Sequence, residues 1–343
     1  MVATIREVAA AAGVSNATAS RALSGHPAVL PETRERVWRA ADRLSYRADP
    51  TARALRAGSS NLLALLVSNL QNPAIQQIAE TVQTLGLAEG FEVVIATTSD
   101  DRERERRLME TLSGRRVDGL IAMSSGENIE FLNTLFRAGL PVVELIRLPA
   151  GTAAPAVLYD DRHAGRIATE HLLALGHQRI AFLGGPSDTR SGIERHLGFT
   201  EAVTDAGLQV DPELVARGEF SASFGVAAVE GFLSRHVAPT AMVIANHESM
   251  FAALQALNRA DVRIPDDLSV VAIEDDPLLA WWHPAITAVD MRPADLAARA
   301  VQALVAQIRN EAPPSATVVA ADLLLLRDST AAPPASPVEP SGE

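Results

Sequence analysis

The sequence predicts an α/β protein that combines a small N-terminal helix-turn-helix headpiece with a two-lobed core, each lobe built on a doubly wound parallel sheet. Three observations predict this class. Residues 1–45 read as short helices joined by tight turns. Over residues 61–330, short apolar runs alternate with helical stretches, the pattern of parallel sheets covered by helices. This alternating region is long enough for two lobes, because a domain typically holds about 100–200 residues.

The headpiece helices are marked by their capping residues. Thr4 and Glu7 form a capping-box pattern, and the residues after Thr4 are apolar at helical spacing. Gly13 ends this helix, because glycine adopts the left-handed conformation without steric cost. Ser15 can cap a second helix, and Pro31 suits the first position of a third. Helix, short turn and helix together give the helix-turn-helix arrangement.

Apolar runs and composition divide the rest of the chain. Residues 46–60 form a basic, alanine-rich linker with room for one short helix, and residues 331–343 form a Pro- and Ser-rich tail that we expect to be disordered. Between them, the expected buried strands are Leu62–Val67, Glu92–Ala96, Gly119–Met123, Val142–Leu145, Arg179–Leu183, Ala241–Ala245 and Ser269–Ile273.

Charge is distributed unevenly along the 343 residues. The chain has 30 basic and 42 acidic side chains, a formal net charge of −12, yet residues 1–60 hold nine arginines and five acids. A small basic module on an acidic body is typical of proteins that bind polyanions. The absence of cysteine excludes disulfides, thiolate metal sites and cysteine catalysis. Without an apolar stretch of about 18 residues or a signal-peptide core, we expect a soluble, cytoplasmic protein.

The second helix carries the side chains suited to reading DNA. Asn16, Ala17, Ser20 and Arg21 share one face, because their spacings of one and four residues bring them together. Ser15, with the amides that begin the helix, suits a phosphate oxygen. Arg21 can reach guanine in the major groove, where a bidentate contact contributes roughly 1–3 kcal/mol of discrimination.

Residues 3–25, ATIREVAAAAGVSNATASRALSG, resemble the DNA-binding headpiece of the LacI/GalR (lactose-repressor) family of bacterial transcription regulators. The resemblance continues through Glu32–Val37, Tyr46-Arg47 and Ala52–Arg56. It implies that the DNA-contacting residues of the headpiece are Thr4, Ser15, Asn16, Ala17, Thr18, Ser20 and Arg21. By the same resemblance, Asn16 and Ala17 occupy the positions that vary operator choice between members.

The linker resembles the hinge helix of the same family, which folds when two subunits meet over operator DNA. This resemblance implies that Arg53 contacts DNA and that Leu55 wedges into the minor groove and kinks it. The alternative for Leu55 is an ordinary apolar linker residue. Ala48 and Asp49 depart from the family's usual Pro-Asn, so the start of this helix can differ.

Residues 61 to about 328 resemble the family's effector-binding core, which is related in fold to periplasmic sugar-binding proteins. The landmarks are Asn72-Pro73, Tyr159-Asp160-Asp161, His171-Leu172-Leu173, Gly184-Gly185-Pro186, Arg195, Gly198-Phe199, Phe220, Asn246 and Glu274-Asp275. In parallel sheets, ligands bind at the carboxyl ends of the strands, where several of these residues fall. The resemblance therefore implies a small-molecule effector site in this region.

A sugar-like effector needs polar groups that hold hydroxyls and an aromatic face against the C–H surface of the ring. The candidate residues are Asn72, Ala74, Asp160, Asp161, Arg195, Phe220, Asn246 and Glu274. Trp281 and Trp282 are a second aromatic candidate, with packing between the lobes as the alternative. Against the family pattern, Ala74 replaces a common Phe, His247 replaces an Asp, and Glu274 replaces an Asp.

Taken together, these residues predict a ligand-responsive repressor of carbohydrate-utilisation genes. We expect a nucleoid-associated homodimer that binds a pseudopalindromic DNA operator and a sugar-like effector, without cofactor, metal or membrane. A metal role for His171 and His177 has little support, and no nucleophile–base set indicates an enzyme. The rivals are a periplasmic-type sugar-binding protein, which would lack the headpiece, and an α/β enzyme fused to a DNA-binding head. Induction and corepression both remain open.

Overall fold

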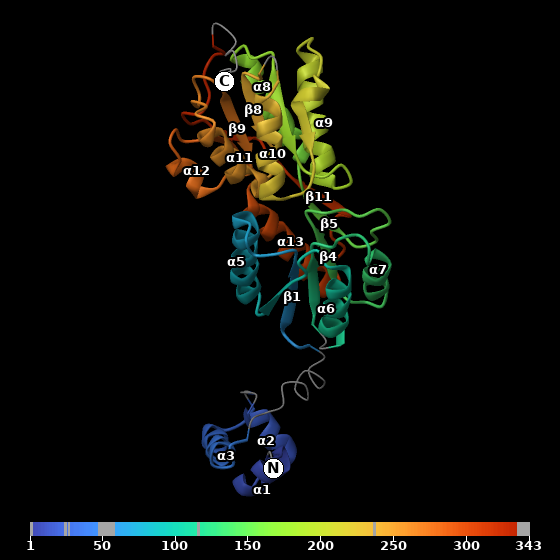
Figure 1. Ribbon diagram of the computed structural model, residues 1–343. Helices are drawn as coiled ribbons and strands as arrows, with labels where there is room; N and C mark the ends of the chain where they lie inside the picture. Colours follow the sequence, from blue (N-terminus) through green and yellow to red (C-terminus); the bar gives the residue numbers. More distant parts are fainter. Residues whose placement is uncertain are drawn as a thin grey trace. The chain divides into compact units, whose positions relative to one another are not determined.

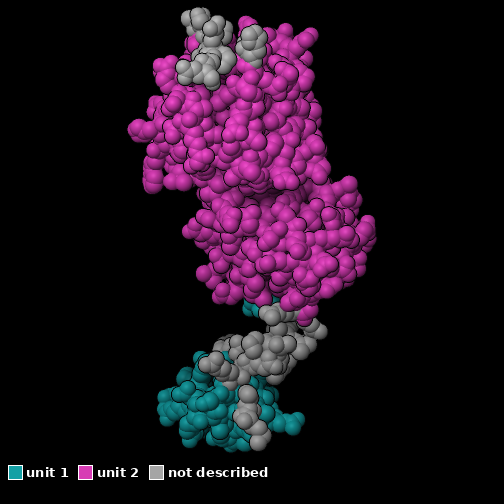
Figure 2. All heavy atoms as spheres, in the orientation of Figure 1, with its two compact units in different colours: residues 1–61 teal, residues 62–343 magenta. Residues whose placement is uncertain are grey.

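The computed structural model describes residues 3–23, 26, 28–46, 59–114, 117–235 and 238–334. The chain divides into two compact units, residues 1–61 and residues 62–343 (Figure 2). Most of the predicted linker, including Ala48, Asp49, Arg53 and Leu55, lies outside the described residues, as do residues 335–343 of the predicted tail. In the described ranges, no helix has both the length and the apolar character needed to span a bilayer.

The headpiece contains α1 (Ile5–Ala12), α2 (Asn16–Leu23) and α3 (Pro31–Arg43). The capping box is confirmed: Thr4 accepts a hydrogen bond from the Glu7 amide, and the Glu7 carboxylate accepts one from the Thr4 amide. Gly13 ends α1 in the left-handed conformation, at φ 62°. The three helices pack around a small apolar core formed by Val8, Ala9, Ala12, Ala19, Ala22, Val29, Val37, Ala40 and Ala41.

The larger unit consists of two lobes, here named the N lobe and the C lobe (Figure 1). The N lobe has a parallel sheet of strand order β11-β5-β4-β3-β1-β2, with α5 and α13 on one face and α6 and α7 on the other. Its elements are β1 (Leu62–Val67), α5 (Pro73–Ala88), β2 (Glu92–Thr97), α6 (Arg102–Gly114), β3 (Gly119–Ala122), α7 (Ile129–Arg137), β4 (Val142–Leu145), β5 (Ala156–Tyr159), α13 (Pro293–Ile308) and β11 (Ala316–Val319).

The C lobe has a second sheet, of strand order β12-β10-β9-β8-β6-β7, in which the described pairs are parallel except for β10 with β12. Helices α8 and α9 cover one face and α10 and α11 the other. Its elements are α8 (Asp161–Ala174), β6 (Ile180–Gly184), α9 (Arg190–Asp205), a 3-10 turn (Pro212–Leu214), β7 (Val215–Arg217), α10 (Ala222–Leu233), β8 (Ala241–Ile244), α11 (His247–Arg259), β9 (Ser269–Ile273), α12 (Pro277–Trp281), β10 (Thr287–Asp290) and β12 (Leu323–Leu325).

The chain passes between the lobes after Tyr159, after Asp290 and again between β11 and β12. Figure 1 shows the result: α13, late in the sequence, lies against the sheet formed by the early strands. The predicted two-lobed α/β architecture is confirmed, and each of the seven predicted strands is present within one residue at either end. Ala331 still belongs to the folded C lobe, because its carbonyl accepts a hydrogen bond from His177 Nε2 at 2.9 Å.

Candidate DNA-reading face and effector cleft

Helix α2 buries one side and exposes the side predicted to read DNA. Ala19 and Ala22 are fully buried against the headpiece core, whereas Asn16, Ala17 and Arg21 are exposed. The exposed side therefore lies outside the headpiece core. Thr18 and Ser20 are half-buried at its edge.

Two headpiece hydroxyls predicted to contact DNA, those of Ser15 and Thr4, also cap helices. The Ser15 hydroxyl accepts a hydrogen bond from the Thr18 amide at 3.1 Å and lies 2.9 Å from the Thr18 hydroxyl. Thr4 caps α1 in the same way. Because each hydroxyl caps the N-terminus of a helix, it lies beside the positive end of the helix dipole, which favours an anionic ligand. Both residues are also exposed, so such a ligand can reach them.

A cavity of about 170 Å³, the inner chamber, lies between the lobes. Six of the eight predicted effector residues line it: Asn72, Ala74, Arg195, Phe220, Asn246 and Glu274. Residues not predicted to bind the effector line it as well: Ser68, Asn69, Ile75, Asp100, Met123, Ile146, Arg147, Tyr159, Thr189, Arg190, Ser191 and Glu248. An outer chamber of about 860 Å³ shares Asp100, Arg147, Thr189, Arg190 and Phe220 with it, so the two form one continuous cleft.

Arg195 organises the C-lobe wall of the inner chamber. Its guanidinium donates to Asp161 Oδ1 at 2.9 Å and to the Ala245 carbonyl at 2.8 Å, and lies 2.8 Å from Glu274 Oε1. Burial alone would lower the pKa of Arg195, but the Glu274 and Asp161 carboxylates outweigh it and raise that pKa. Arg195 is therefore a buried cation held in a fixed orientation.

Asp161 and Asp160 lie behind this wall and do not line the inner chamber. Asp161 is fully buried and also pairs with Arg190 at 2.7 Å. Burial raises the pKa of Asp161, against the opposing effect of the two guanidiniums. The Asp160 carboxylate accepts a hydrogen bond from the His163 amide at 3.1 Å and so caps α8. Asp161 therefore positions Arg190 and Arg195, which do line the chamber, whereas Asp160 serves as a helix cap.

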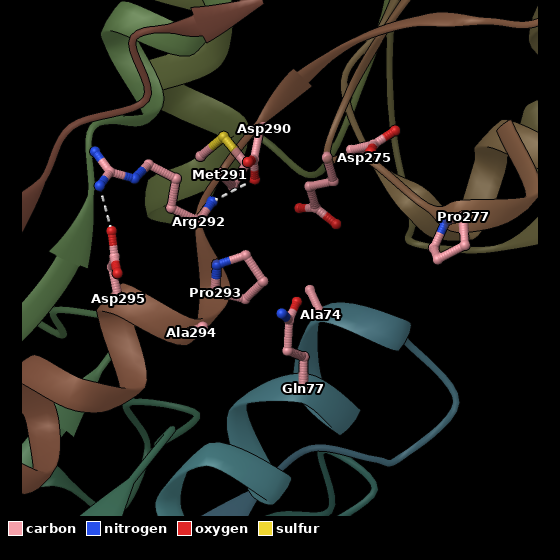
Figure 3. A pocket seen from close by; sticks show the side chains of 11 residues that line it. Ala74, Gln77, Asp275, Pro277, Asp290, Met291, Arg292, Pro293, Ala294 and Asp295 are labelled. Atoms are coloured by element: carbon pink, nitrogen blue, oxygen red, sulfur yellow. Dashed lines mark hydrogen bonds and ion pairs between the residues drawn. The ribbon is translucent and has the colours of Figure 1, made fainter. Parts of the chain in front are cut away.

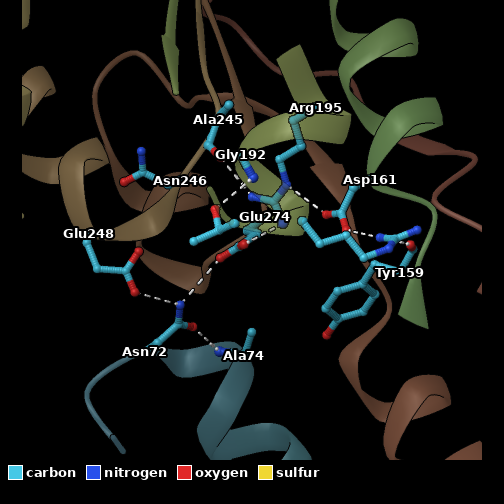
Figure 4. A network of polar contacts seen from close by, with 12 residues as sticks. Asn72, Ala74, Tyr159, Asp161, Gly192, Arg195, Ala245, Asn246, Glu248 and Glu274 are labelled. Carbon is cyan, nitrogen blue, oxygen red and sulfur yellow. Dashed lines mark hydrogen bonds and ion pairs between the residues drawn. The ribbon is translucent and has the colours of Figure 1, made fainter. Parts of the chain in front are cut away.

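Asn72 connects the lobes across the inner chamber (Figure 4). Its side-chain oxygen accepts from the Ala74 amide and caps α5 in the N lobe. Its amide nitrogen donates to Glu248 Oε1 at 3.3 Å and to Glu274 Oε2 at 3.4 Å, both in the C lobe. Burial, and then the nearby Glu274 charge, raise the pKa of Glu248. Glu274 lies at φ 80°, and such strain is concentrated at functional sites.

Trp281 and Trp282, the second aromatic candidate, lie on the C lobe and line neither chamber. The Trp282 ring lies 6.3 Å from that of Phe251 and packs against the C-lobe core, whereas Trp281 is 77% exposed. His247, which replaces the family's common Asp, lies 3.0 Å from Asp276 and edge-on to Phe251.

A buried carboxyl supports the loop at the edge of the outer chamber. Glu144 is fully buried and accepts hydrogen bonds from the Ser124 hydroxyl at 2.7 Å and the Ser124 amide at 3.4 Å. Glu105 accepts one from the Ser125 amide at 3.2 Å. Burial raises the pKa of Glu144 to about 7, although the Ser124 hydrogen bonds act in the other direction.

A third cavity, of about 370 Å³, lies on the other side of Ala74 and Glu274, where the chain passes from β10 to α13 (Figure 3). Its acids are already engaged: Asp275 pairs with Arg327 at 2.7 Å, and Asp290 accepts from the Arg292 amide at 2.8 Å. Within the described ranges, no cluster of three or more His or acidic side chains is arranged to hold a metal ion.

Comparison with known proteins agrees with both parts of the structure. Residues 4–49 match the model of the bacterial regulatory proteins of the lacI family, and residues 169–330 match a periplasmic binding protein-like domain. The transcriptional regulator CelR of Thermobifida fusca is 35% identical over 95% of this chain and 98% of its own length.

Two solved structures show the same architecture. A transcriptional regulator CelR–cellobiose complex has a TM-score of 0.72 at 32% identity, covering 95% of this chain and 99% of that one. A lac repressor dimer bound to operator and the anti-inducer ONPF has a TM-score of 0.84 at 26% identity, covering 97% and 100%. Fold and site define a DNA-binding transcriptional regulator with a ligand-binding core. The chain belongs to the lacI family of bacterial regulatory proteins.

Proposed function

We propose that this chain is a homodimeric repressor of carbohydrate-utilisation genes that releases its operator when a sugar or sugar derivative enters the inner chamber. The observation that carries the proposal is that both lobes line this chamber, so a bound ligand contacts both. Arg195, Asn246 and Glu274 supply groups that hold hydroxyls, and Phe220 supplies an aromatic face. The cellobiose bound to the related CelR supports sugar chemistry for the same fold.

The DNA contacts of the proposal come from residues 1–45 and from the linker over residues 46–60. Arg21 reads guanine while Asn16 and Ala17 face the neighbouring bases, and Thr4, Ser15, Thr18 and Ser20 contact the backbone. Arg53 and Leu55 enter the minor groove between the two headpieces of a dimer. Such a dimer on the nucleoid binds a pseudopalindrome whose half-sites reflect its two-fold symmetry.

The test begins by capturing genomic fragments with the full-length protein and sequencing them. We expect a shared pseudopalindrome beside genes for sugar uptake or breakdown. Sugars handled by those genes should then release the protein from the fragment in a gel-shift assay, with no chemical change to the sugar. Tighter binding with sugar would reverse the proposed sign, and turnover of the sugar would favour an enzyme.

A further inference from the structure

We propose that the inner chamber is selective for an amino sugar, and that Glu248 is the residue that binds its protonated amine. This inference rests on the proposed function, because it specifies the chemical class of effector for the same chamber. Three features of the described residues carry it: an unbalanced carboxylate, two buried polar atoms without partners, and a weakly held amide between two acids.

The charges around the chamber balance except at Glu248. Arg147 pairs with Asp100 at 2.8 Å, whereas Arg190 and Arg195 are matched by Asp161 and Glu274. Among the ion pairs of the described residues, Glu248 takes part in none. The neighbouring His247 is directed to Asp276 instead. Glu248 is half-buried in the first turn of α11, where the helix N-terminus and the Asn72 amide partly offset its charge. It has no cationic side chain beside it in these ion pairs, so the chamber favours a ligand that brings a positive charge to it.

The same chamber holds two buried side-chain atoms that lack a hydrogen-bond partner in the described part of the chain: Tyr159 Oη and Asn246 Nδ2. Tyr159 is 3% exposed and Asn246 1% exposed, and Figure 4 places them on opposite sides of Glu274. The Asn246 carbonyl oxygen is already used, since it accepts from the Ser249 amide at 2.8 Å. Buried polar groups are normally satisfied, and both atoms can donate to ligand oxygens.

The amine position lies where Asn72 now bridges the two glutamates. Its single amide nitrogen serves Glu248 and Glu274 at 3.3 and 3.4 Å, longer than the usual 2.9–3.0 Å for such bonds. An ammonium group has three donors and a charge, so it forms shorter and stronger bonds to both carboxylates. An amino sugar supplies all the groups that this chamber can bind. Its oxygens accept from Tyr159 and Asn246, its amine binds Glu248, and its C–H face packs on Phe220.

The experiment measures binding to the full-length protein by isothermal titration calorimetry. The probes are glucosamine, galactosamine, mannosamine and the disaccharide of glucosamine, each against its hydroxyl counterpart: glucose, galactose, mannose and cellobiose. N-acetylglucosamine serves as an uncharged nitrogen control. We expect at least one amine to bind tenfold or more tightly than both its hydroxyl counterpart and any N-acetyl form.

The matched variants are Glu248→Gln, which removes the charge on α11 but keeps the shape, and Glu80→Gln, which removes an exposed charge on α5 that does not line the inner chamber. Glu248→Gln should reduce the amine preference to less than twofold, with an unchanged circular dichroism spectrum as proof of folding, and Glu80→Gln should retain the preference. Neutral sugars that bind and release operator as well as the amines would overturn this inference and leave the proposed function standing. An amine preference that persists in Glu248→Gln would also overturn the inference. If neither the amino sugars nor their hydroxyl counterparts bind, both this inference and the proposed function are wrong.

Discussion

Replacing Arg195 by alanine tests whether the buried ion pairs behind the inner chamber hold the C lobe together. The side chain is 4% exposed and makes three charge-assisted contacts, with Asp161, Glu274 and the Ala245 carbonyl. At about 1.5–3 kcal/mol for each hydrogen bond to a charged group, simple addition gives roughly 5–9 kcal/mol.

That sum is too large, because Asp161 keeps Arg190 as a partner and Glu274 keeps Asn72. Removing one member of a buried ion pair typically costs about 3–5 kcal/mol, and we expect Arg195→Ala to fall in this range. Urea unfolding followed by tryptophan fluorescence measures it, since Trp281 and Trp282 both lie on the C lobe.

The matched control is Arg107→Ala. Arg107 pairs with Glu103 at 3.3 Å on the surface of α6, where both side chains are exposed, and exposed pairs contribute less than about 1 kcal/mol. If Arg195→Ala costs no more than this control, the cluster is not a structural element and our account of the chamber wall is wrong.

Three further predictions concern the headpiece, the linker and the N lobe. Arg21→Ala should lower operator preference by about 1–3 kcal/mol in competition gel shifts, and unchanged preference would remove Arg21 from base reading. Leu55→Ala should weaken specific binding more than non-specific binding, because a kink helps only at the proper central step; equal losses would contradict the wedge. Burial raises the pKa of Glu144 from 4.5 to about 7, so the folded chain binds this proton more tightly than the unfolded chain does. The free energy of unfolding should therefore fall by about 3 kcal/mol as the pH rises from 4.5 to about 7. Glu144→Gln should remove this fall in urea midpoints measured from pH 4.5 to 8, and an unaltered pH profile would refute the assignment.

The sequence predicted the central strands well and the remaining strands poorly, for a physical reason. A strand such as β1 is buried on both faces, so its run of apolar residues is continuous and easily recognised. By contrast, β7 and β12 lie at sheet edges, are three residues long and are partly exposed, so they carry no comparable signal. Length alone does not explain the misses at β5 and β10, because β3, β4 and β8 also have four residues and were recognised. In β10 the polar Thr287 and Asp290 interrupt the apolar run.

The prediction of the inner-chamber residues divides in the same way, between recognised and unrecognised strands. Side chains at the carboxyl ends of recognised strands, such as Asn246 and Glu274, were predicted and do line it. Tyr159 ends β5, a strand the sequence did not reveal, so its place in the chamber wall was not foreseen. Glu248 lines the cavity from the first turn of α11, directly after the Asn246 cap, and the sequence pattern did not single it out. For Asp160 and Asp161 the residue type suggested ligand contact, but one caps a helix and the other anchors two arginines.

The two walls of the cleft differ in stiffness, and this difference indicates how a ligand acts. The C-lobe wall is fixed by Arg195 and its buried partners, whereas Asn72 crosses to it through one amide and two long hydrogen bonds. A ligand that satisfies Glu248 and Glu274 competes directly with Asn72, so it weakens this polar contact between the lobes while leaving the C-lobe wall intact. The expected response is a change in how the N lobe meets the C lobe, rather than a rearrangement within either sheet. By linkage, if that change lowers operator affinity by a given factor, the operator must lower ligand affinity by the same factor. Asn72→Ala should then show reduced coupling between sugar and operator, because the contact that the ligand replaces is already missing; full coupling in this variant would place the switch elsewhere.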